Sequence, residues 1–401
     1  MRTPGRSAPV TPEARIATAA DLLDVILAGD PAERALTDWA RRNRYAGSRD
    51  RAAIRDHVYD ALRCRRSFAL LGGGETGRGL MLGYLLSEGR DPRDVFTGQG
   101  YGPAPLTGAE AAALAETPAE ALRAAPRPVA CDMPDWLWPQ LETSLGDRTE
   151  TIAAILRRRA PVFLRVNLRK TDRAAARAAL AAEEIVTRPH ALAETALEVT
   201  DGARRVAMSR AYDEGLVELQ DAASQAVAAA LPLREGLSVL DYCAGGGGKT
   251  LAIAGRIDGT FTAHDADAGR MADLPERARR AGIAVTLTDR PRGPFDLVLC
   301  DVPCSGSGAW RRSPSGKWAL SQETLDRLNA TQLDILKRAA GLVAPGGTLA
   351  YVTCSLLRAE NQERVAAFRA TDPGWRIAAE RQFLPDEGGD GFYLACLSRT
   401  G

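Results

Sequence analysis

The stretch from Phe295 to Gly308, which reads FDLVLCDVPCSGSG, constrains the fold of this chain more than any other. Its apolar beginning is typical of a strand that is buried on both faces of a parallel sheet. The strand ends abruptly at Asp301, and Cys304 follows among small residues. Open α/β sheets bind ligands beyond the carboxyl ends of their strands, so both side chains are expected at a ligand site. A second buried strand, residues 348–355, is expected to carry Cys354 to the same edge.

The second half of the chain alternates strands, glycine turns and helices from about Gly215. This order predicts an α/β fold with a doubly wound parallel sheet. Its strands are expected near residues 239–241, 260–267, 283–289, 295–301 and 348–355.

Ahead of this sheet domain, residues 215–401, the pattern predicts three further parts. Residues 1–12 are rich in proline, arginine and small side chains, so they are expected to be a disordered tail. Residues 13–125 show helical periodicity and predict an all-α domain. Residues 130–214 alternate strands and helices, which predicts a small α+β subdomain.

Nine arginines and three acids lie between Arg41 and Arg66. Because 52 basic residues balance 51 acidic ones over the whole chain, a polyanion would have to be bound by a local patch such as this one. Arg49, Arg51 and Arg55 are the candidate contacts. A solvated helix face is the alternative interpretation, and for an isolated charge run it is the commoner one.

Seven cysteines show no spacing typical of a metal site, so no metal is expected. Their odd number, their apolar surroundings and the lack of a signal peptide indicate a reducing compartment, and we expect a cytoplasmic monomer. The uncharged stretch 339–357 is interrupted by Pro345-Gly346-Gly347, so no membrane span is expected.

A glycine turn with the sequence CAGGGGKT occupies residues 243–250. A phosphate-binding P-loop would need glycine in place of Cys243, and a dinucleotide fingerprint would need glycine in place of Thr250. What remains is a glycine turn between two strand-end acids, Asp241 and Asp265, which suits a cofactor with an ammonium group and a ribose diol but no pyrophosphate. S-adenosylmethionine has these features, whereas a tight turn without a ligand is the structural alternative. The expected cofactor residues are Cys243, Ala244, Gly245, Gly246, Gly247, Gly248, Lys249, Asp265, Asp289 and Asp301.

Several motifs together resemble the Sun family of RsmB-like RNA cytosine-5 methyltransferases. They are CAGGGGKT (243–250), DVPCSGSG (301–308) and TCS (353–355), with QD at 220–221, PGG at 345–347 and EN at 360–361. The middle segment resembles the family's small RNA-recognition-like subdomain, and residues 15–66 resemble a NusB-like helical RNA-binding domain. One departure is that Gly245 and Gly246 stand where the family's usual loop, CAAPGGK, has alanine and proline. We therefore expect a looser loop and a lower cofactor affinity.

The resemblance implies a division of work between two thiols. Carbon 5 of cytosine is a poor nucleophile until a thiolate adds to carbon 6 and creates an enamine, which is a form of covalent catalysis. By resemblance, Cys354 is the nucleophile and Cys304 promotes release of the product. The residues alone do not decide which thiol is the nucleophile, because DNA cytosine methyltransferases use a cysteine in a Pro-Cys motif, which is the opposite assignment. Burial as small apolar residues is the alternative for both thiols, and it is expected for Cys300.

Other side chains are candidates for roles beside the two thiols. Lys249 is a candidate for activating the thiol, and Asp301 for holding the ring edge of cytosine. Lys317 lies in a segment that resembles the family's substrate-facing loop, with Trp310 and Trp318 available to stack bases.

These motifs predict an S-adenosylmethionine-dependent RNA (cytosine-5)-methyltransferase that acts on 16S ribosomal RNA through a covalent Cys–cytosine intermediate. A tRNA is the alternative substrate. An RNA-binding assembly or antitermination factor that keeps the methyltransferase fold as a scaffold is the alternative from another class. The presence of both thiols, Asp301 and Lys249 argues against that alternative.

Overall fold

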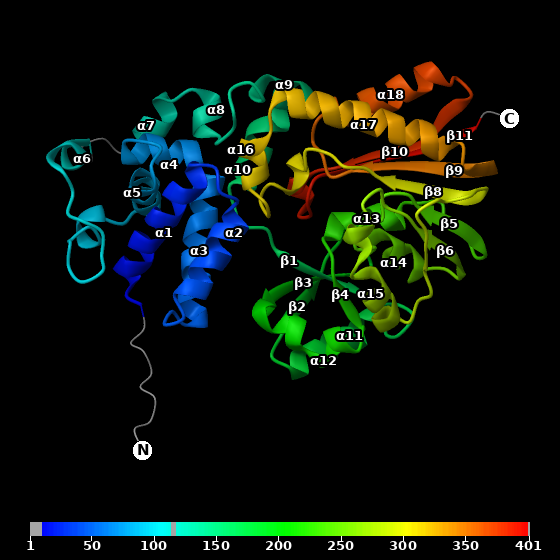
Figure 1. Cartoon of the computed structure of the whole chain (residues 1–401), viewed down its shortest axis with the longest axis horizontal. Coiled ribbons are helices and arrows are strands. Elements are labelled where there is room, and N and C mark those ends of the chain that lie inside the picture. Colours follow the sequence, from blue (N-terminus) through cyan, green and yellow to red (C-terminus); the bar gives the residue numbers. More distant parts are fainter. Residues whose placement is uncertain (1–9, 114–117, 400–401) are drawn as a thin grey trace. The chain divides into compact units, whose positions relative to one another are not determined.

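The computed structural model describes residues 10–113 and 118–399 (Figure 1). Most of the expected tail, residues 1–9, lies outside the described residues. The chain forms two compact units. The first contains the described residues up to Glu142, with Asp147–Arg159 and Trp310–Ala319; the second contains Thr143–Gly146, Ala160–Ala309 and the described residues from Leu320 onward.

The first unit is helical, as the sequence predicts. The hydroxyl of Thr11 caps α1 by accepting the backbone N–H of Ala14, and the helix ends before Gly29. Its buried Ile16 and Leu23 pack with apolar residues of the other long helices. The main helices of this unit are α1 (Pro12–Leu27), α2 (Ala32–Arg42), α3 (Ser48–Arg63), α4 (Arg65–Gly72), α5 (Gly77–Ser87), α6 (Gly108–Ala113), α7 (Pro118–Ala124), α8 (Arg127–Ala130), most of α9 (Trp138–Leu145) and α10 (Thr149–Leu156).

A segment from far along the chain, Trp310–Ala319, also belongs to this helical unit. It contains the short helix α16 (Ser315–Ala319), and the Nε1 of Trp318 donates a hydrogen bond to the backbone oxygen of Leu62 at 2.7 Å. The sequence placed these residues in the sheet domain. Their packing against the end of α3 shows that chain order alone does not assign them.

The small α+β part of the second unit is a four-stranded antiparallel sheet with the order β2-β3-β1-β4. Its strands are β1 (Val162–Val166), β2 (Val186–Pro189), β3 (Ala196–Asp201) and β4 (Val217–Leu219), accompanied by the helices α11 (Arg173–Ala182) and α12 (Arg210–Asp213). Because β4 pairs with β1, this sheet extends past residue 214, where the sequence placed its end. A three-residue strand is too short to show a periodic pattern.

The larger sheet of the second unit has the order β10-β11-β9-β8-β5-β6-β7. Its strands are β5 (Leu237–Asp241), β6 (Gly259–Ala263), β7 (Thr286–Leu287), β8 (Phe295–Asp301), β9 (Val343–Thr353), β10 (Trp375–Phe383) and β11 (Phe392–Arg399). The five strands from β5 to β9 are parallel, which confirms the predicted α/β fold class. The sequence analysis did not predict β10 and β11, an antiparallel pair at one edge. Most of β10 is exposed and mixes charged with apolar residues, whereas β11 is a buried apolar run that could have been recognised.

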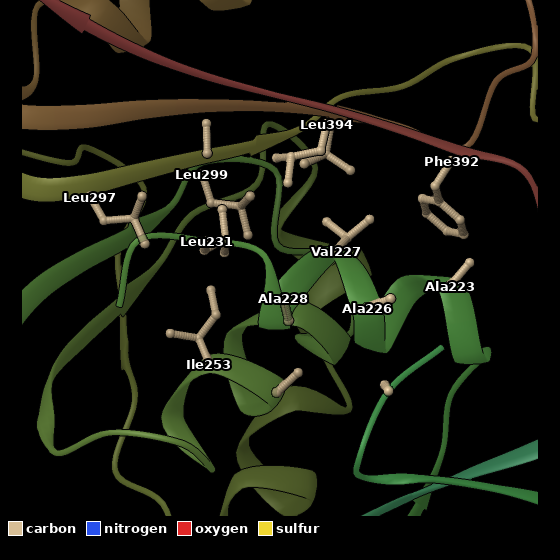
Figure 2. Packing of buried hydrophobic residues seen from close by; sticks show 14 of the residues in the cluster. Ala223, Ala226, Val227, Ala228, Leu231, Ile253, Leu297, Leu299, Phe392 and Leu394 are labelled. Atoms are coloured by element: carbon tan, nitrogen blue, oxygen red, sulfur yellow. The ribbon is translucent and has the colours of Figure 1, made fainter. Parts of the chain in front are cut away.

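Helices cover both faces of this sheet, and Figure 2 shows the packing on one of them. Along β8, Leu297 and Leu299 pack with α13 (Ala222–Ala229) and α14 (Gly248–Ala254), whereas Val298 and Cys300 pack with α17 (Gln322–Ala340) and α18 (Gln362–Thr371). Each such leucine contributes about 1.5–3 kcal/mol through burial. Cys300 is thus a core residue, as expected, and the end of β8 projects from a packed scaffold. Among the described helices, none is long and apolar enough to cross a membrane.

Candidate active site

Two thiols meet at the carboxyl edge of the larger sheet. β8 and β9 are parallel neighbours, so the residues that follow them emerge side by side. The Sγ atoms of Cys304 and Cys354 lie 3.4 Å apart, and both side chains are half-buried. The backbone N–H of Gly308 donates to the backbone oxygen of Cys354 at 2.9 Å, which ties the two loops together. The structure therefore brings together the two cysteines that the sequence singled out.

The buried carboxylate of Glu360 holds the residues that follow both cysteines. It accepts the backbone N–H of Ser305 at 2.8 Å and the hydroxyls of Ser305 and Ser355 at 2.5 Å each. The Nε2 of Gln332 donates a further bond to it at 3.0 Å. In the sequence, Glu360 stood out only as part of the EN pair at 360–361. No local pattern predicted its contacts with the loops that carry Cys304 and Cys354.

Cys304, which follows β8, and Cys243, at the start of the glycine turn, both have raised pKa values. The hydrogen bond with Cys354 and then burial raise the pKa of Cys304 well above its ordinary value of 9.0, so Cys304 keeps its proton at neutral pH. Burial also raises the pKa of Cys243, whose thiol stays neutral. Within residues 10–113 and 118–399, no group of acids, histidines and cysteines is arranged to hold a metal ion.

Lys249, which is buried, and Asp301, which is partly exposed, form an ion pair beside the thiols. The Nζ of Lys249 lies 2.6 Å from the Oδ2 of Asp301 and 4.8 Å from the ring centroid of Phe392. Burial alone would lower the pKa of Lys249, but the charge and hydrogen bond of Asp301, with a smaller effect of Cys354, raise it. Lys249 therefore stays charged, and its direct partner is Asp301 rather than a thiol.

The glycine turn is bound to the second strand-end acid. The Oδ2 of Asp265, which is buried, accepts the backbone N–H of Gly245 at 3.0 Å. Gly245 and Gly247 have φ values of +48° and +74°, which glycine adopts without strain. A Cβ on Gly247 would also come within 2.1 Å of the Cδ1 of Leu274. The turn continues into α14 at Gly248, so the predicted cofactor residues of this stretch form one continuous edge.

Asp241 presents an unmatched acceptor at this edge. Its Oδ2 accepts the hydroxyl of Thr250 at 2.7 Å, but its Oδ1 is buried and has no hydrogen-bond partner among the described residues. Burial raises the pKa of Asp241 to about 7. Since buried polar atoms are almost always paired, this oxygen fits a ligand with a cationic donor such as an ammonium group.

Two predicted cofactor residues lie at the margins of this edge. The backbone N–H of Ala244 donates to the backbone oxygen of His264 at 2.8 Å, so Ala244 helps to fix the turn. Asp289 follows β7 with an exposed side chain, and the described structure shows only a loose 3.9 Å approach to Arg290. No contact seen in the described residues links Asp289 to the other acids.

Lys317 lies inside the helical unit, contrary to its expected role as a substrate contact. It is 1% exposed, and its Nζ donates to the backbone oxygen of Arg63 at 3.1 Å. Burial lowers its pKa to about 8, against the opposing effect of the Asp132 carboxylate. Trp310 is buried as well. The physical reason is tertiary packing: the buried Trp310 and the hydrogen bond of Trp318 to Leu62 hold this segment among the helices and enclose Lys317.

The three predicted RNA-binding arginines all lie on α3 and differ in their hydrogen-bond partners. Arg49 is exposed. The Nε of Arg51 donates to the backbone oxygen of Ala46 at 2.9 Å, and Arg55 pairs with Glu33 at 2.9 Å. Exposed pairs of this kind contribute little energy, so Arg55 can exchange its partner for a phosphate.

Comparison with known proteins identifies a family and relatives that this chain resembles. Residues 228–398 match the family described as 16S rRNA methyltransferase RsmB/F, and residues 133–205 match the ferredoxin-like domain of RsmF/B-like methyltransferases. Ribosomal RNA small subunit methyltransferase B of Vibrio cholerae is 35% identical over 283 residues, which are 66% of this chain and 65% of that protein. The protein of the same name from Xylella fastidiosa strain 9a5c is 36% identical over 286 residues, or 66% of this chain and 68% of that protein.

The match thus spans just under two thirds of the Vibrio cholerae relative. A crystal structure of the protein PH0851 has a TM-score of 0.74 and 20% identity over 97% of this chain and 99% of that chain, which shows a shared fold. Taken with the matched domains and the identity to the Xylella fastidiosa protein, these findings show that the chain belongs to the RsmB/RsmF family of 16S rRNA methyltransferases.

Proposed function

We propose that this protein is an S-adenosylmethionine-dependent methyltransferase that forms 5-methylcytosine in 16S ribosomal RNA in the cytoplasm. Membership of the RsmB/RsmF family supports methyl transfer to ribosomal RNA. The observation that carries the choice of carbon 5 is the contact of Cys304 with Cys354 at 3.4 Å. Ring nitrogens and hydroxyl oxygens have lone pairs that attack a methyl donor directly, whereas a pyrimidine carbon needs a thiol to activate it.

The edge formed by the glycine turn and the strand-end acids would hold the cofactor. Asp265 would accept the ribose hydroxyls, and the unmatched oxygen of Asp241 would accept the ammonium group. S-adenosylmethionine supplies an electrophilic methyl group on a sulfonium. Replacement of Asp265 by alanine should weaken cofactor binding by about 1–3 kcal/mol, because polar partners lose their match. Asp289 is exposed and should contribute less to cofactor binding, so Asp289→Ala is the matched control for Asp265→Ala.

The reaction at the ring follows from the two thiols. The thiolate of Cys354 would add to carbon 6 of cytosine, and the electron pair of the carbon 5–carbon 6 double bond would move to carbon 5, which would take the methyl group as the bond between that group and the sulfonium breaks with its electrons on the donor sulfur. The carbon 5 proton would then pass to solvent water, its electron pair would restore the ring double bond, and the bond between the Cys354 sulfur and carbon 6 would break with its electrons on Cys354. Because Cys304 keeps its proton and contacts Cys354, it assists this departure by donating a hydrogen bond to the leaving sulfur.

Asp301 and Lys249 position the base in this account. Asp301 accepts a hydrogen bond from the amino group of cytosine, and the ammonium of Lys249, 2.6 Å from the Oδ2 of Asp301, holds this carboxylate in place. Lys249 also places a positive charge near the sulfur of Cys354.

The function is tested with purified protein, a methyl-labelled cofactor and three RNAs: free 16S ribosomal RNA, the small ribosomal subunit and bulk tRNA. Digestion of the RNA to nucleosides should place the label in 5-methylcytidine from ribosomal RNA. Label in another nucleoside would exclude cytosine-5 chemistry. Label confined to tRNA would exclude the proposed substrate while leaving the chemistry intact.

A further inference from the structure

Two arginine side chains bind the backbone of the glycine turn from outside. The Nη1 of Arg277, on α15 (Leu274–Ala281), donates a hydrogen bond to the carbonyl oxygen of Gly246. The Nη1 of Arg165, on β1, donates to the carbonyl oxygen of Gly248 at 2.8 Å. These bonds fix two carbonyls of the turn, so their direction no longer depends on the glycines alone.

Both arginines are themselves held by the last strand of the small sheet and the residue that follows it. The Nη1 of Arg165 also donates to the Oε1 of Gln220 at 2.5 Å. The Oε2 of Glu218, a residue that is 8% exposed, lies 2.5 Å from the Nη2 of Arg280 and 3.5 Å from the Nε of Arg277, so Glu218 draws both arginines of α15 to this edge. Arg165 and Glu218 face each other in the pairing of β1 with β4. The small α+β subdomain therefore presents a prearranged charged edge to the turn.

The position of Arg277 depends on the absence of a side chain at residue 246. A Cβ on Gly246 would lie 2.7 Å from the Nη1 of Arg277, which is too close for both to keep their places. Gly246→Ala would push the end of the Arg277 side chain away and weaken its bond to the carbonyl. The turn needs such an outside constraint, because consecutive glycines have more conformational freedom to lose than any other residues.

We propose that Arg277 and Arg165 act as positioning residues that hold the glycine turn in its cofactor-binding conformation, with Glu218 and Gln220 holding the arginines. The inference rests on the proposed function and deepens it, since it makes cofactor affinity depend on the small subdomain. It also accounts for the two glycines at 245 and 246, because the rigidity that a loop with alanine and proline would have in its own backbone comes here from outside contacts.

The test is a mutant cycle read out by calorimetric titration of S-adenosylmethionine into the full-length protein. Arg277→Ala should weaken binding about tenfold or more, the size expected for a lost hydrogen bond from a charged group. Gly246→Ala should weaken it similarly, and the double variant should bind no worse than either single variant because both remove one contact. Arg277→Lys, which keeps a charged donor, should recover part of the affinity. The control is Arg279→Ala, since Arg279 is exposed on the same helix and pairs with Glu276.

Hydrogen exchange of the cofactor-free protein provides a second readout. The amides of Gly245 and Gly247 should exchange faster in Arg277→Ala, while the amides of β8 keep their protection and show that the fold is intact. Equal affinities and equal exchange in Arg277→Ala and Arg279→Ala would overturn the inference, as would additive losses in the double variant. Failure of the unmodified protein to bind S-adenosylmethionine would instead overturn the proposed function, and the exchange experiment would still decide whether the arginines hold the turn.

Discussion

Cys304 and Cys354 lie 50 positions apart in the sequence, yet their Sγ atoms are 3.4 Å apart. Parallel pairing of β8 with β9 brings the two loops to one edge, and the contact of Gly308 with Cys354 draws them together. This contact is what the proposed reaction requires, since one thiol would attack carbon 6 while the other lies close enough to act on the sulfur that leaves.

Glu360 should control this distance. Glu360→Ala leaves the donors of Ser305, Ser355 and Gln332 unmatched, at a cost of about 1–3 kcal/mol for each buried donor that finds no water. Urea denaturation should show the lost stability. Because the cofactor edge is formed by other residues, the turnover rate should fall with little change in cofactor affinity. A variant with unchanged stability and turnover would contradict the role of Glu360.

Asp241 should release a proton when the cofactor binds. Its pKa of about 7 means that the carboxyl is mostly protonated at about pH 6, and a cationic ligand group favours the ionised form. Affinity should therefore rise as the pH increases through 7. Titrations in two buffers of different ionisation enthalpy measure the released proton directly. Asp241→Asn should bind more weakly and release none, whereas proton release that persists in Asp241→Asn would assign it to another group.

Arg49, Arg51 and Arg55 should contribute to RNA binding by neutralising phosphates. Their joint replacement by alanine should weaken RNA affinity and flatten its salt dependence, by up to about 0.7 in the slope of log K for each lost contact on single strands. Arg49→Ala alone should have a larger effect than Arg55→Ala, because Arg55 must first leave Glu33. The buried Lys317 provides the control, since Lys317→Met should leave the salt slope unchanged. An unchanged salt slope in the triple variant would mean that the three arginines form only a solvated helix face and do not contact RNA.

The parallel strands of the larger sheet and both thiols could be predicted because local signals indicate them. β8 contains the apolar run 297–300 and ends at an acid, and the glycine turn follows β5 directly. Glu360, Arg165 and Arg277 could not, because their partners lie 55, 83 and 31 positions away and depend on how separate elements fold together. A charged residue inside the apolar strand β1 was the one available signal, and it marks Arg165.

The prediction that Lys317 contacts RNA differs from the structure for a related reason. Its place after the DVPCSGSG motif suggested a substrate loop, but burial depends on tertiary packing that the sequence does not display. The neighbouring tryptophans were interpreted as stacking platforms, although apolar side chains at such spacing are equally typical of a packed segment.

The central claim is that Cys354 attacks the base and that Cys304 promotes release of the methylated base from Cys354. The most direct test incubates the unmodified protein, Cys304→Ala and Cys354→Ala with 16S ribosomal RNA and S-adenosylmethionine, and then separates the products by denaturing electrophoresis. Cys304→Ala should accumulate a protein–RNA adduct that survives denaturation, whereas Cys354→Ala should form none and should lose turnover while still binding the cofactor. An adduct with Cys354→Ala and none with Cys304→Ala would reverse the two roles. No adduct with either variant, together with methylation by both, would contradict covalent catalysis by this pair.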